Sequence, residues 1–369
     1  MKIAVDLTYI REETNTGLAN YAFYLLKGFR ENGLRDSVVI LTESGFGEGF
    51  AAYTEGFRTI PAETRMLPFL PFTRGPLFRR KLEAVIKSEG IGLLLSPYIY
   101  DRSLYARNVP CIGVIHDTKL FYQGNPILRA RYRIGAVRAL NRLERIVAIS
   151  GCTRDDLIKI PGVKTGIEVI HNSVVSNAGK LEKEVCNPPY ILDVNTLLEH
   201  KNPLTLLKAF ELVSREIPHN LVFKGSRTPY WDTVLEPYIA SHSLSDRVEL
   251  NETRLSQEEM EHLYRNADLF VSPSMMEGFG FTPIEAALAG VPVICNDLPA
   301  LVESTRGLVT YYSPAQDASA LADKILYVLE NREYIKTEEI RGEFASAYSP
   351  SRQAECFAEL ISSVCGRRF

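Results

Sequence analysis

The sequence predicts an α/β protein made of two doubly wound domains, each with a parallel sheet covered by helices on both faces. A chain of 369 residues is too long for one ordinary domain and fits two. Short β-rich runs alternate with longer helical stretches along the chain, which is the pattern of βαβ units. The alternation breaks once, at the polar segment 175–189 (VSNAGKLEKEVCNPP), which is typical of an exposed linker.

Six strands are expected in the first domain, at residues 2–8, 37–43, 91–96, 111–116, 145–150 and 167–172. Its helices are expected at 17–32, 77–89 and 127–143. We place this domain at residues 1–180.

Six more strands are expected in the second domain, at 190–195, 220–224, 247–251, 268–273, 291–296 and 307–312. Its helices are expected at 202–216, 231–242, 256–266, 283–289 and 317–330. We place this domain at residues 187–350. A last helix within 351–369 is expected to pack back toward the N-terminal domain.

The composition is that of a globular protein from a reducing compartment. Hydrophobic residues make up 46% and charged residues 24%, enough apolar material for two cores. The six cysteines are scattered without a CxxC pair, which disfavours a disulfide scaffold and a zinc site. The chain opens directly on a strand pattern, and no apolar run approaches the ~18 residues that span a bilayer. We therefore expect a cytoplasmic protein.

The most informative segment is 268–297 (DLFVSPSMMEGFGFTPIEAALAGVPVICND). A strand leads into a loop with Glu277 and a glycine pair beginning at Gly278, and a helix is expected from near Pro283 to Gly290. A glycine-containing loop before a helix exposes backbone N–H groups at the positive end of the helix dipole. The segment therefore predicts a phosphate or diphosphate site.

Two carboxylates flank this loop. Glu277 precedes it and Glu285 lies in the following helix, and carboxylates accept hydrogen bonds from sugar hydroxyls. Each has an ordinary alternative. Thr282 and Glu285 form a T-x-x-E capping box, and Glu277 alone is a common loop carboxylate.

Residues 268–297 resemble the signature of the family-4 retaining glycosyltransferases (glycosyltransferase group 1). That signature is a PS-x-x-EGFG block, with two glutamates eight positions apart, followed by EA-x-x-x-GVPV. Here it begins at Pro273, carries Glu277 and Glu285, and ends with the Gly290 segment.

This resemblance implies the GT-B fold, with two Rossmann-like domains facing a central cleft. The N-terminal domain would bind the acceptor and the C-terminal domain the nucleotide-sugar. Glu277 would contact the transferred sugar, and Glu285 would bind the ribose. The backbone amides that hold the diphosphate would belong to Gly278, Phe279, Gly280 and Phe281.

The segment VNTLLEHKN resembles a family loop in which Gly-Thr-Leu leads to an Arg-Lys-Asn that neutralises the donor phosphates. Lys201 and Asn202 match, and a lysine suits a leaving diphosphate. Asn195 stands where glycine is usual, and His200 where arginine is usual. Lys224 ends the next strand, on the side where the family holds the nucleotide. The alternative for Lys201 is a solvated lysine at the start of a helix, and a glycine after a strand, as at 225, is common in any case.

Two positions of the first domain complete the expected site. His116, in the pair with Asp117, follows an apolar strand, and the resemblance implies that it contacts the sugar. A structural histidine is the alternative. Gly17 lies where the family uses a glycine to bring the backbone close to the donor phosphate or to the acceptor. No group at metal-ligand spacing accompanies them, and the resemblance implies no divalent cation or other cofactor.

Residues 126–145 carry six arginines against one glutamate. Ile134, Val137, Leu140 and Leu143 are expected to line the opposite helical face. Such a helix fits an anionic membrane surface that presents a lipid-linked acceptor, and a solvated cationic helix is the alternative. No nucleic-acid-binding motif accompanies the charge. Residues 1–185 hold 26 basic and 19 acidic side chains, which gives a net charge of +7. The remaining residues hold 16 basic and 26 acidic side chains, which gives a net charge of −10.

We therefore expect a metal-independent retaining hexosyltransferase that uses a nucleoside-diphosphate sugar and acts in cell-surface polysaccharide synthesis. GDP-mannose is the favoured donor. In the favoured front-face route, Glu277 and His116 position the sugar, and the leaving phosphate takes the acceptor proton. Two alternatives stay open. They are a sugar-nucleotide 2-epimerase of GT-B architecture and a non-catalytic nucleotide-sugar-binding protein.

Overall fold

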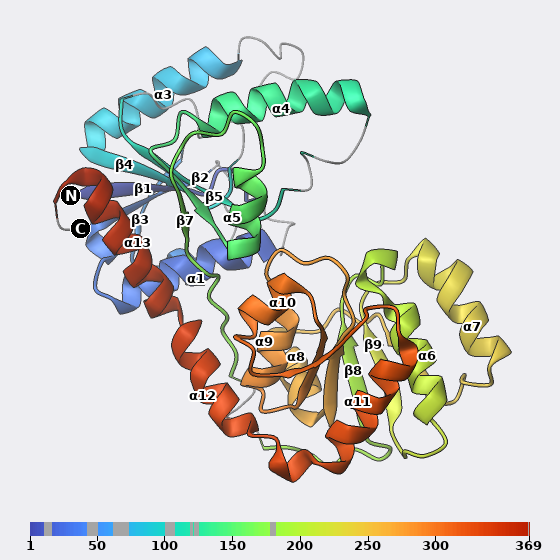
Figure 1. Cartoon of the computed structure of the whole chain (residues 1–369). Coiled ribbons are helices and arrows are strands. Elements are labelled where there is room, and N and C mark those ends of the chain that lie inside the picture. The colour runs from blue at the N-terminus through green and yellow to red at the C-terminus, as the bar shows by residue number, and fades with distance from the viewer. Residues whose placement is uncertain are drawn as a thin grey trace. The chain divides into compact units, whose positions relative to one another are not determined.

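The computed structural model places the chain in two compact units (Figure 1). It describes residues 1–10, 17–42, 51–61, 74–99, 108–118, 121, 125–177, 182–367 and 369. Unit 1 comprises Met1–Ser173 and Tyr348–Phe369, and unit 2 comprises Val174–Ala347.

In the described residues, unit 1 contains a parallel seven-stranded sheet in the order β3-β2-β1-β4-β5-β6-β7. Its strands are β1 (Lys2–Asp6), β2 (Val38–Thr42), β3 (Arg58–Pro61), β4 (Ile91–Ser96), β5 (Cys111–Ile115), β6 (Arg145–Ala148) and β7 (Ile167–Val169). The strands follow one another outward in opposite directions from the neighbouring pair β1 and β4, as in other doubly wound sheets.

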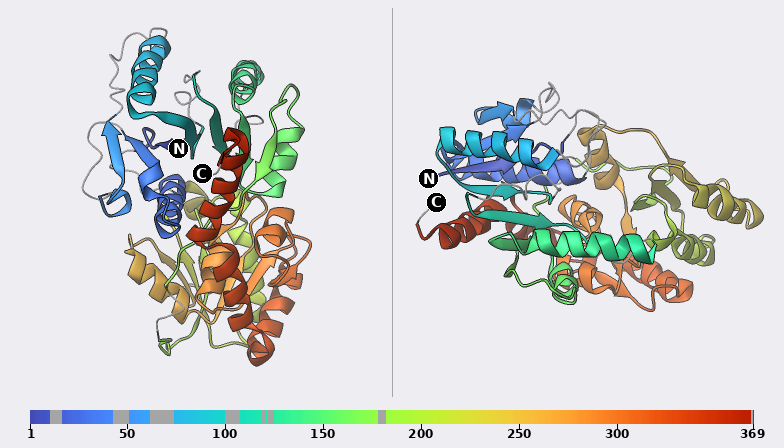
Figure 2. Two further views of the ribbon diagram at one scale, coloured as in Figure 1. Left: turned by 90° about the vertical axis from the view of Figure 1, so that its left-hand side faces the viewer. Right: turned by 90° about the horizontal axis from the view of Figure 1, so that it is seen from above.

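Helices cover both faces of this sheet (Figures 1 and 2). They are α1 (Gly17–Glu31), α2 (Ala51–Thr54), α3 (Arg74–Glu89), α4 (Pro126–Leu140), α5 (Gly151–Ile158) and α13 (Pro350–Cys365), with a 3₁₀ turn at Arg35–Ser37. Leu82 of α3 and Leu140 of α4 share a buried cluster with Ala4 of β1. Because side chains alternate along a strand, Ile3 and Val5 point to the other face, where α1 and α13 lie.

The sheet of unit 2 has six parallel strands in the order β10-β9-β8-β11-β12-β13, within the described residues. They are β8 (Tyr190–Val194), β9 (Asn220–Lys224), β10 (Val248–Asn251), β11 (Leu269–Ser272), β12 (Val293–Asn296) and β13 (Thr310–Tyr312). Its helices are α6 (Pro203–Val213), α7 (Glu236–Ser241), α8 (Gln257–Asn266), α9 (Phe281–Leu288), α10 (Pro299–Ser304), α11 (Ala318–Glu330) and α12 (Thr337–Ala347). Short 3₁₀ turns lie at Glu199–Lys201 and Arg332–Tyr334. The order of these strands reverses between β8 and β11. The carboxyl ends of these two strands are therefore the expected ligand site.

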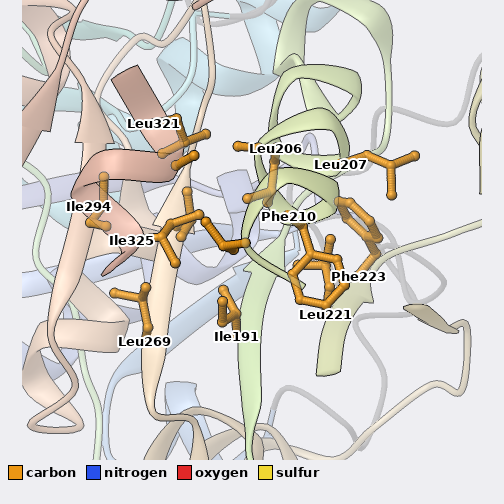
Figure 3. Close-up of a cluster of buried hydrophobic side chains, with 14 of the residues drawn as sticks. Ile191, Leu206, Leu207, Phe210, Leu221, Phe223, Leu269, Ile294, Leu321 and Ile325 are labelled. Atoms are coloured by element: carbon orange, nitrogen blue, oxygen red, sulfur yellow. The ribbon is translucent and has the colours of Figure 1, made fainter. Parts of the chain in front are cut away.

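The core of unit 2 lies between this sheet and helices α6 and α11 (Figure 3). Leu206 and Phe210 of α6, and Leu321 and Ile325 of α11, are fully buried against strand residues such as Ile191. Burial of each side chain of this size stabilises the folded state by about 1.5–3 kcal/mol. The core therefore fixes the strand ends from which the site loops depart.

The two-domain α/β class predicted from the sequence is confirmed, and most element boundaries differ by a few residues. Five elements were not predicted: β3, α2, α5, α10 and α12. β3 is mostly exposed at the sheet edge, α5 buries only Thr153 and Leu157, and α12 buries only Phe344. Elements that bury so little carry almost no apolar periodicity. The helix expected at 231–242 is a π-helical turn at Trp231–Leu235 followed by α7.

The segment expected as an exposed linker is partly tied to unit 2. Val185 is 97% exposed. The Lys183 ammonium, however, lies 2.8 Å from the Asp268 carboxylate, and the backbone N–H of Glu184 donates to Asn266. The chain passes between the units at 173–174 and 347–348. The expected boundaries were 180, 187 and 350.

Helix α13 packs on α1 through a close backbone approach. A β-carbon at Gly28 would lie 2.0 Å from the carbonyl oxygen of Pro350. Beside it, the Asn32 side-chain amide donates to the backbone carbonyl of Ser351 at 2.9 Å. This contact therefore requires glycine at position 28.

We predict that Gly28→Ala lowers the free energy of unfolding of unit 1 by about 1–3 kcal/mol, because the two helices must separate. The matched control is Gly135→Ala in α4, where a β-carbon meets no atom within 4 Å. It should raise helix stability by about 0.5–1 kcal/mol. Urea unfolding followed by circular dichroism measures both variants. Tryptophan fluorescence is unsuitable because the single tryptophan, Trp231, lies in unit 2. Equal stability of Gly28→Ala and wild type would contradict the close packing.

Candidate active site

A pocket of about 640 Å³ lies at the carboxyl ends of the unit 2 strands. It is lined by the ends of β8, β9, β10 and β11 and by the first residues of α9. Its lining residues are Val194, Asn195, Thr196, Lys201, Lys224, Gly225, Ser226, Glu252, Thr253, Arg254, Met260, Ser272, Pro273, Ser274, Glu277, Gly280, Phe281 and Thr282. The pocket therefore occupies the position where doubly wound sheets bind ligands.

An ion pair joins two of the predicted site residues inside this pocket. The Lys201 ammonium donates to Oε1 of Glu277 at 2.6 Å, and the two side chains are only 17% and 18% exposed. Lys201 comes from the turn before α6 and Glu277 from the loop after β11. The structure thus brings together the residues that the sequence assigned to the phosphates and to the sugar.

Asn202 holds this pair in place. It has a left-handed backbone with φ of 58°, and its buried side chain links three segments. Its amide donates to the carbonyls of Pro273 at 3.2 Å and Ala315 at 2.7 Å, and its side-chain oxygen accepts from the Thr205 hydroxyl at 2.7 Å. Asparagine tolerates the left-handed conformation better than most residues. Asn202 is therefore a scaffold residue next to Lys201.

The N-terminus of α9 opens toward the pocket. The helix begins at Phe281, and its N-cap, Gly280, has a φ of 89° and no side-chain capping bond. Gly280 is required here because of this φ, and because a β-carbon would lie 2.5 Å from Leu301. Phe279 is buried against Phe281, and Gly278 is not among the lining residues. The amides at the start of α9 form an arrangement that favours an anion.

Glu285 does not cap this helix. The alternative interpretation of Thr282 and Glu285 as a capping box is wrong, because α9 begins two residues earlier than predicted and Gly280 is its N-cap. The Glu285 carboxylate instead accepts a 2.7 Å hydrogen bond from the Tyr264 hydroxyl of α8. Burial raises the pKa of Glu285, and the Tyr264 bond partly opposes that rise. Glu285 is partly exposed and lies outside the pocket lining.

Lys224 lines the pocket, but its ammonium serves a neighbouring loop. It donates to the backbone carbonyls of Asn251 at 3.1 Å and Thr253 at 2.6 Å. Partial burial lowers its pKa. The loop it holds, 252–254, lines the pocket and was missed from the sequence. The loop 252–254 directly follows β10, beside the end of β9, and this position is the feature from which its place in the pocket could have been predicted.

Asn195, which replaces the usual glycine, closes the loop after β8. Its side-chain amide donates to the Asp193 carboxylate at 2.5 Å, and its side-chain oxygen accepts from the Leu197 N–H at 2.5 Å. The loop runs so close to β9 that a β-carbon at Gly225 would lie 2.2 Å from the Asn195 carbonyl. Asp193 is 1% exposed, and burial raises its pKa to about 7. An acid within the apolar strand YILDV was a signal that sequence reasoning passed over.

His116 and Gly17 belong to unit 1 and not to this pocket. His116 follows β5, and its Nε2 lies 2.8 Å from the Pro97 carbonyl, so Nε2 carries the proton and Nδ1 is an acceptor. Its ring meets Tyr21 edge-on, and burial lowers its pKa to about 4, so the imidazole is neutral at pH 7. Gly17 begins α1, is exposed, and has no atom within 4 Å of a β-carbon position. Its neighbours 11–16 lie outside the described residues.

Two absences among the described residues concern metal binding and membrane spanning. No three His, Cys, Asp or Glu side chains there are grouped so that they could hold a metal ion. No helix in that part of the chain has the length and apolarity needed to cross a bilayer.

Comparison with known families identifies the class of protein. The family described as glycosyl transferases group 1 matches residues 180–345, which include the pocket. The family described as Glycosyltransferase Family 4 matches residues 15–177. The chain belongs to the family-4, group 1 glycosyltransferases. This confirms the family predicted from residues 268–297.

Two curated relatives share parts of the sequence. The O-antigen chain mannosyltransferase RfbU of Salmonella typhimurium is 31% identical over 208 residues, 56% of this chain and 57% of the relative. The O-antigen chain mannosyltransferase B of Escherichia coli is 25% identical over 249 residues, 63% of this chain and 64% of the relative. The chain thus matches less than two thirds of the length of either relative.

Solved structures share the fold over almost the whole chain. A glycosyltransferase of Rickettsia africae superposes with a TM-score of 0.77 at 18% identity, covering 98% of both chains. Anabaena HepE, solved in complex with UDP and glucose, gives 0.72 at 17% identity, covering 98% of this chain and all of that one. The predicted GT-B class is confirmed. The predicted central cleft between the two domains stays a prediction.

Proposed function

We propose that this protein transfers a hexose from a nucleoside-diphosphate sugar to a saccharide or lipid-linked saccharide, in the synthesis of a cell-surface polysaccharide. The observation that carries the proposal is the pocket at the reversal of strand order in unit 2. There the uncapped start of α9 lies beside the Lys201–Glu277 pair. The names of the two O-antigen mannosyltransferase relatives support a mannosyl donor, and we propose GDP-mannose.

The proposed donor site follows from the chemistry of the lining. The amides of Phe281 and Thr282 and the ammonium of Lys201 bind the diphosphate, since helix N-termini and lysines favour phosphate charge. The nucleoside extends toward the ends of β9 and β10, where Gly225 and the loop 252–254 line the pocket. We propose that Glu285 binds the ribose. A ribose hydroxyl and the Tyr264 hydroxyl then both donate to the Glu285 carboxylate. HepE was solved with UDP, which supports a nucleotide ligand for this fold.

The proposed reaction keeps the anomeric configuration and needs no metal ion. Glu277 accepts hydrogen bonds from sugar hydroxyls, and His116 contacts the transferred sugar, as the family resemblance implies. His116 is neutral at pH 7, so it serves as a hydrogen-bonding group and not as an acid. The acceptor oxygen attacks the anomeric carbon, the bond to the diphosphate breaks, and the leaving phosphate oxygen takes the acceptor proton. Cationic and dipolar groups at that oxygen stabilise its growing charge.

We predict that Lys201→Met weakens GDP binding about 10- to 100-fold, because a charge-assisted hydrogen bond to phosphate is worth about 1.5–3 kcal/mol. The matched control is Lys208→Met, which removes an exposed lysine of α6. Thermal shift with GDP, UDP and ADP, with and without EDTA, measures binding. We expect GDP to raise the Tm of wild type and of the control, and EDTA to change nothing. Absence of a shift with every nucleotide would contradict the donor site.

Analysis of the reaction products separates this function from its alternatives. With GDP-mannose and a diphosphate-linked saccharide acceptor, a glycosyltransferase gives GDP and an extended acceptor, and NMR of the new linkage shows whether the configuration is retained. Acceptor-independent conversion of the sugar in the donor would instead identify an epimerase. Binding without any turnover, hydrolysis included, would identify a non-catalytic binding protein.

We also propose that the C-terminal part of α4 contacts anionic lipid. The expected apolar face is wrong at one position. Leu140 and Leu143 are buried in the core, whereas Ile134 is 56% exposed, on the same side as the exposed Arg138. Arg142 is exposed just beyond the helix. One apolar side chain beside arginines is an arrangement that suits a membrane surface.

Arg138→Gln with Arg142→Gln is predicted to lower binding to phosphatidylserine-containing vesicles about 10- to 30-fold at low salt, at about 1 kcal/mol per charge. Co-sedimentation measures this. Lys208→Gln with Arg215→Gln, two exposed cations of unit 2, is the control and should bind like wild type. Equal losses in both double variants would show non-specific attraction only, and would reject the α4 surface.

A further inference from the structure

Asp193 is a buried carboxyl group directly beneath the pocket that the proposed reaction does not use. It lies one residue before the end of β8 and is 1% exposed. Its neighbours in sequence, Val194 and Asn195, line the pocket. A carboxylate buried in this way is costly unless it is paired and hydrogen-bonded.

The local structure gives Asp193 an amide partner and holds that partner rigidly. The Asn195 side chain donates to the carboxylate at 2.5 Å and is itself fixed by the Leu197 N–H. The loop has no room to move toward β9, because Gly225 is already in close contact with it. One neutral amide stabilises both the ionised and the protonated carboxyl, since a carboxyl oxygen accepts in either state. The site therefore tolerates a change of charge at Asp193 without a change of partners.

The ionisable groups that face Asp193 from the described elements are few. Asp193 interacts electrostatically with Lys201 and Glu277 of the pocket, with Tyr264 of α8 and with Tyr312 of β13. Lys201 is already paired with Glu277. Burial and Glu277 raise the pKa of Asp193 to about 7, while Asn195 and Lys201 oppose the rise. Near neutral pH, Lys201, Glu277 and Asp193 together thus carry a charge between zero and −1.

We propose that Asp193 is a positioning residue of the donor site that takes up a proton from solvent when a nucleoside diphosphate binds. The protonated carboxyl leaves the Lys201–Glu277 pair with no net negative charge, so the incoming phosphates meet no uncompensated carboxylate. This inference rests on the proposed function, because it needs a diphosphate in the pocket.

The direction of the effect follows from linkage. A bound diphosphate adds negative charge near Asp193 and raises its pKa further. Affinity is then full at pH 6, where Asp193 is protonated in the free protein, and falls as the pH rises through 7, because a proton must be taken up. A displacement of about one pKa unit corresponds to about a tenfold loss of affinity. Asp193→Asn is neutral at every pH, and its side-chain oxygen still accepts from Asn195.

The experiment is isothermal titration of the full-length protein with GDP, and with UDP, at pH 6 and pH 8.5, and at pH 7.5 in HEPES and in Tris. The two buffers differ in ionisation enthalpy, so the difference in heat gives the number of protons taken up. Comparing wild type with Asp193→Asn removes the titration of the nucleotide's own terminal phosphate. Glu249→Gln, an exposed carboxylate lost from β10, is the matched control.

We expect wild type and Glu249→Gln to lose about tenfold more affinity between pH 6 and pH 8.5 than Asp193→Asn. Proton uptake should be lower in Asp193→Asn alone, and this variant should bind more tightly than wild type at pH 8.5. A merely structural role would instead weaken the variant at both pH values. Equal proton uptake, or parallel pH profiles, would overturn the proposal.

Two further outcomes have separate meanings. If neither nucleotide binds wild type at any pH, the proposed function fails, and the inference falls with it. If Asp193→Asn does not fold, infrared difference spectra of wild type decide the matter. Addition of GDP at pH 7.5 must then convert a carboxylate band into a carboxylic acid band, and spectra without that conversion would reject the proposal.

Discussion

The pocket of unit 2 depends on one left-handed residue. Asn202 ends the short turn that carries Lys201, begins the next helix, and hydrogen-bonds carbonyl groups of two other segments. That side chain adds to the backbone hydrogen bond from the Met275 N–H to the His200 carbonyl, which also links the turn to the loop that carries Glu277. The 2.6 Å ion pair across the pocket is thus set by a buried amide that faces no ligand. Scaffold and charge are adjacent in sequence, at positions 202 and 201.

That arrangement makes the Lys201–Glu277 pair electrically neutral before any ligand enters. Lys201 is compensated by Glu277, and the charge below them, at Asp193, depends on protonation. An anion entering the pocket must draw Lys201 away from Glu277 or share it, while the helix dipole of α9 acts without such competition. The helix terminus thus offers a constant attraction, and the side chains offer an adjustable one. In the proposed function, Lys201 turns toward the phosphates, and Glu277 is then available to the hydroxyl groups of the sugar.

The sequence predicted what depends on long apolar periods and on local motifs. The strands that are buried on both faces were predicted because such strands form continuous hydrophobic runs. The loop from Glu277 to the start of α9 was predicted because its glycines precede a helix. The edge strand β3 and the short helices α5 and α12 were missed because they bury few side chains. The partners of Lys224 and Glu285 could not be predicted, because Thr253 and Tyr264 reach them through tertiary packing. The roles of individual site residues in binding and reaction remain predictions.

Helix α13 has a consequence for how the chain reaches its native state. Unit 1 is completed by residues 348–369, which are made only after the whole of unit 2. Domains commonly fold in order of synthesis, N-terminal first. Here the face of α1 that receives Pro350 stays uncovered while roughly half of the chain is still being translated. The second unit is free to finish folding first, and the first-made unit closes last.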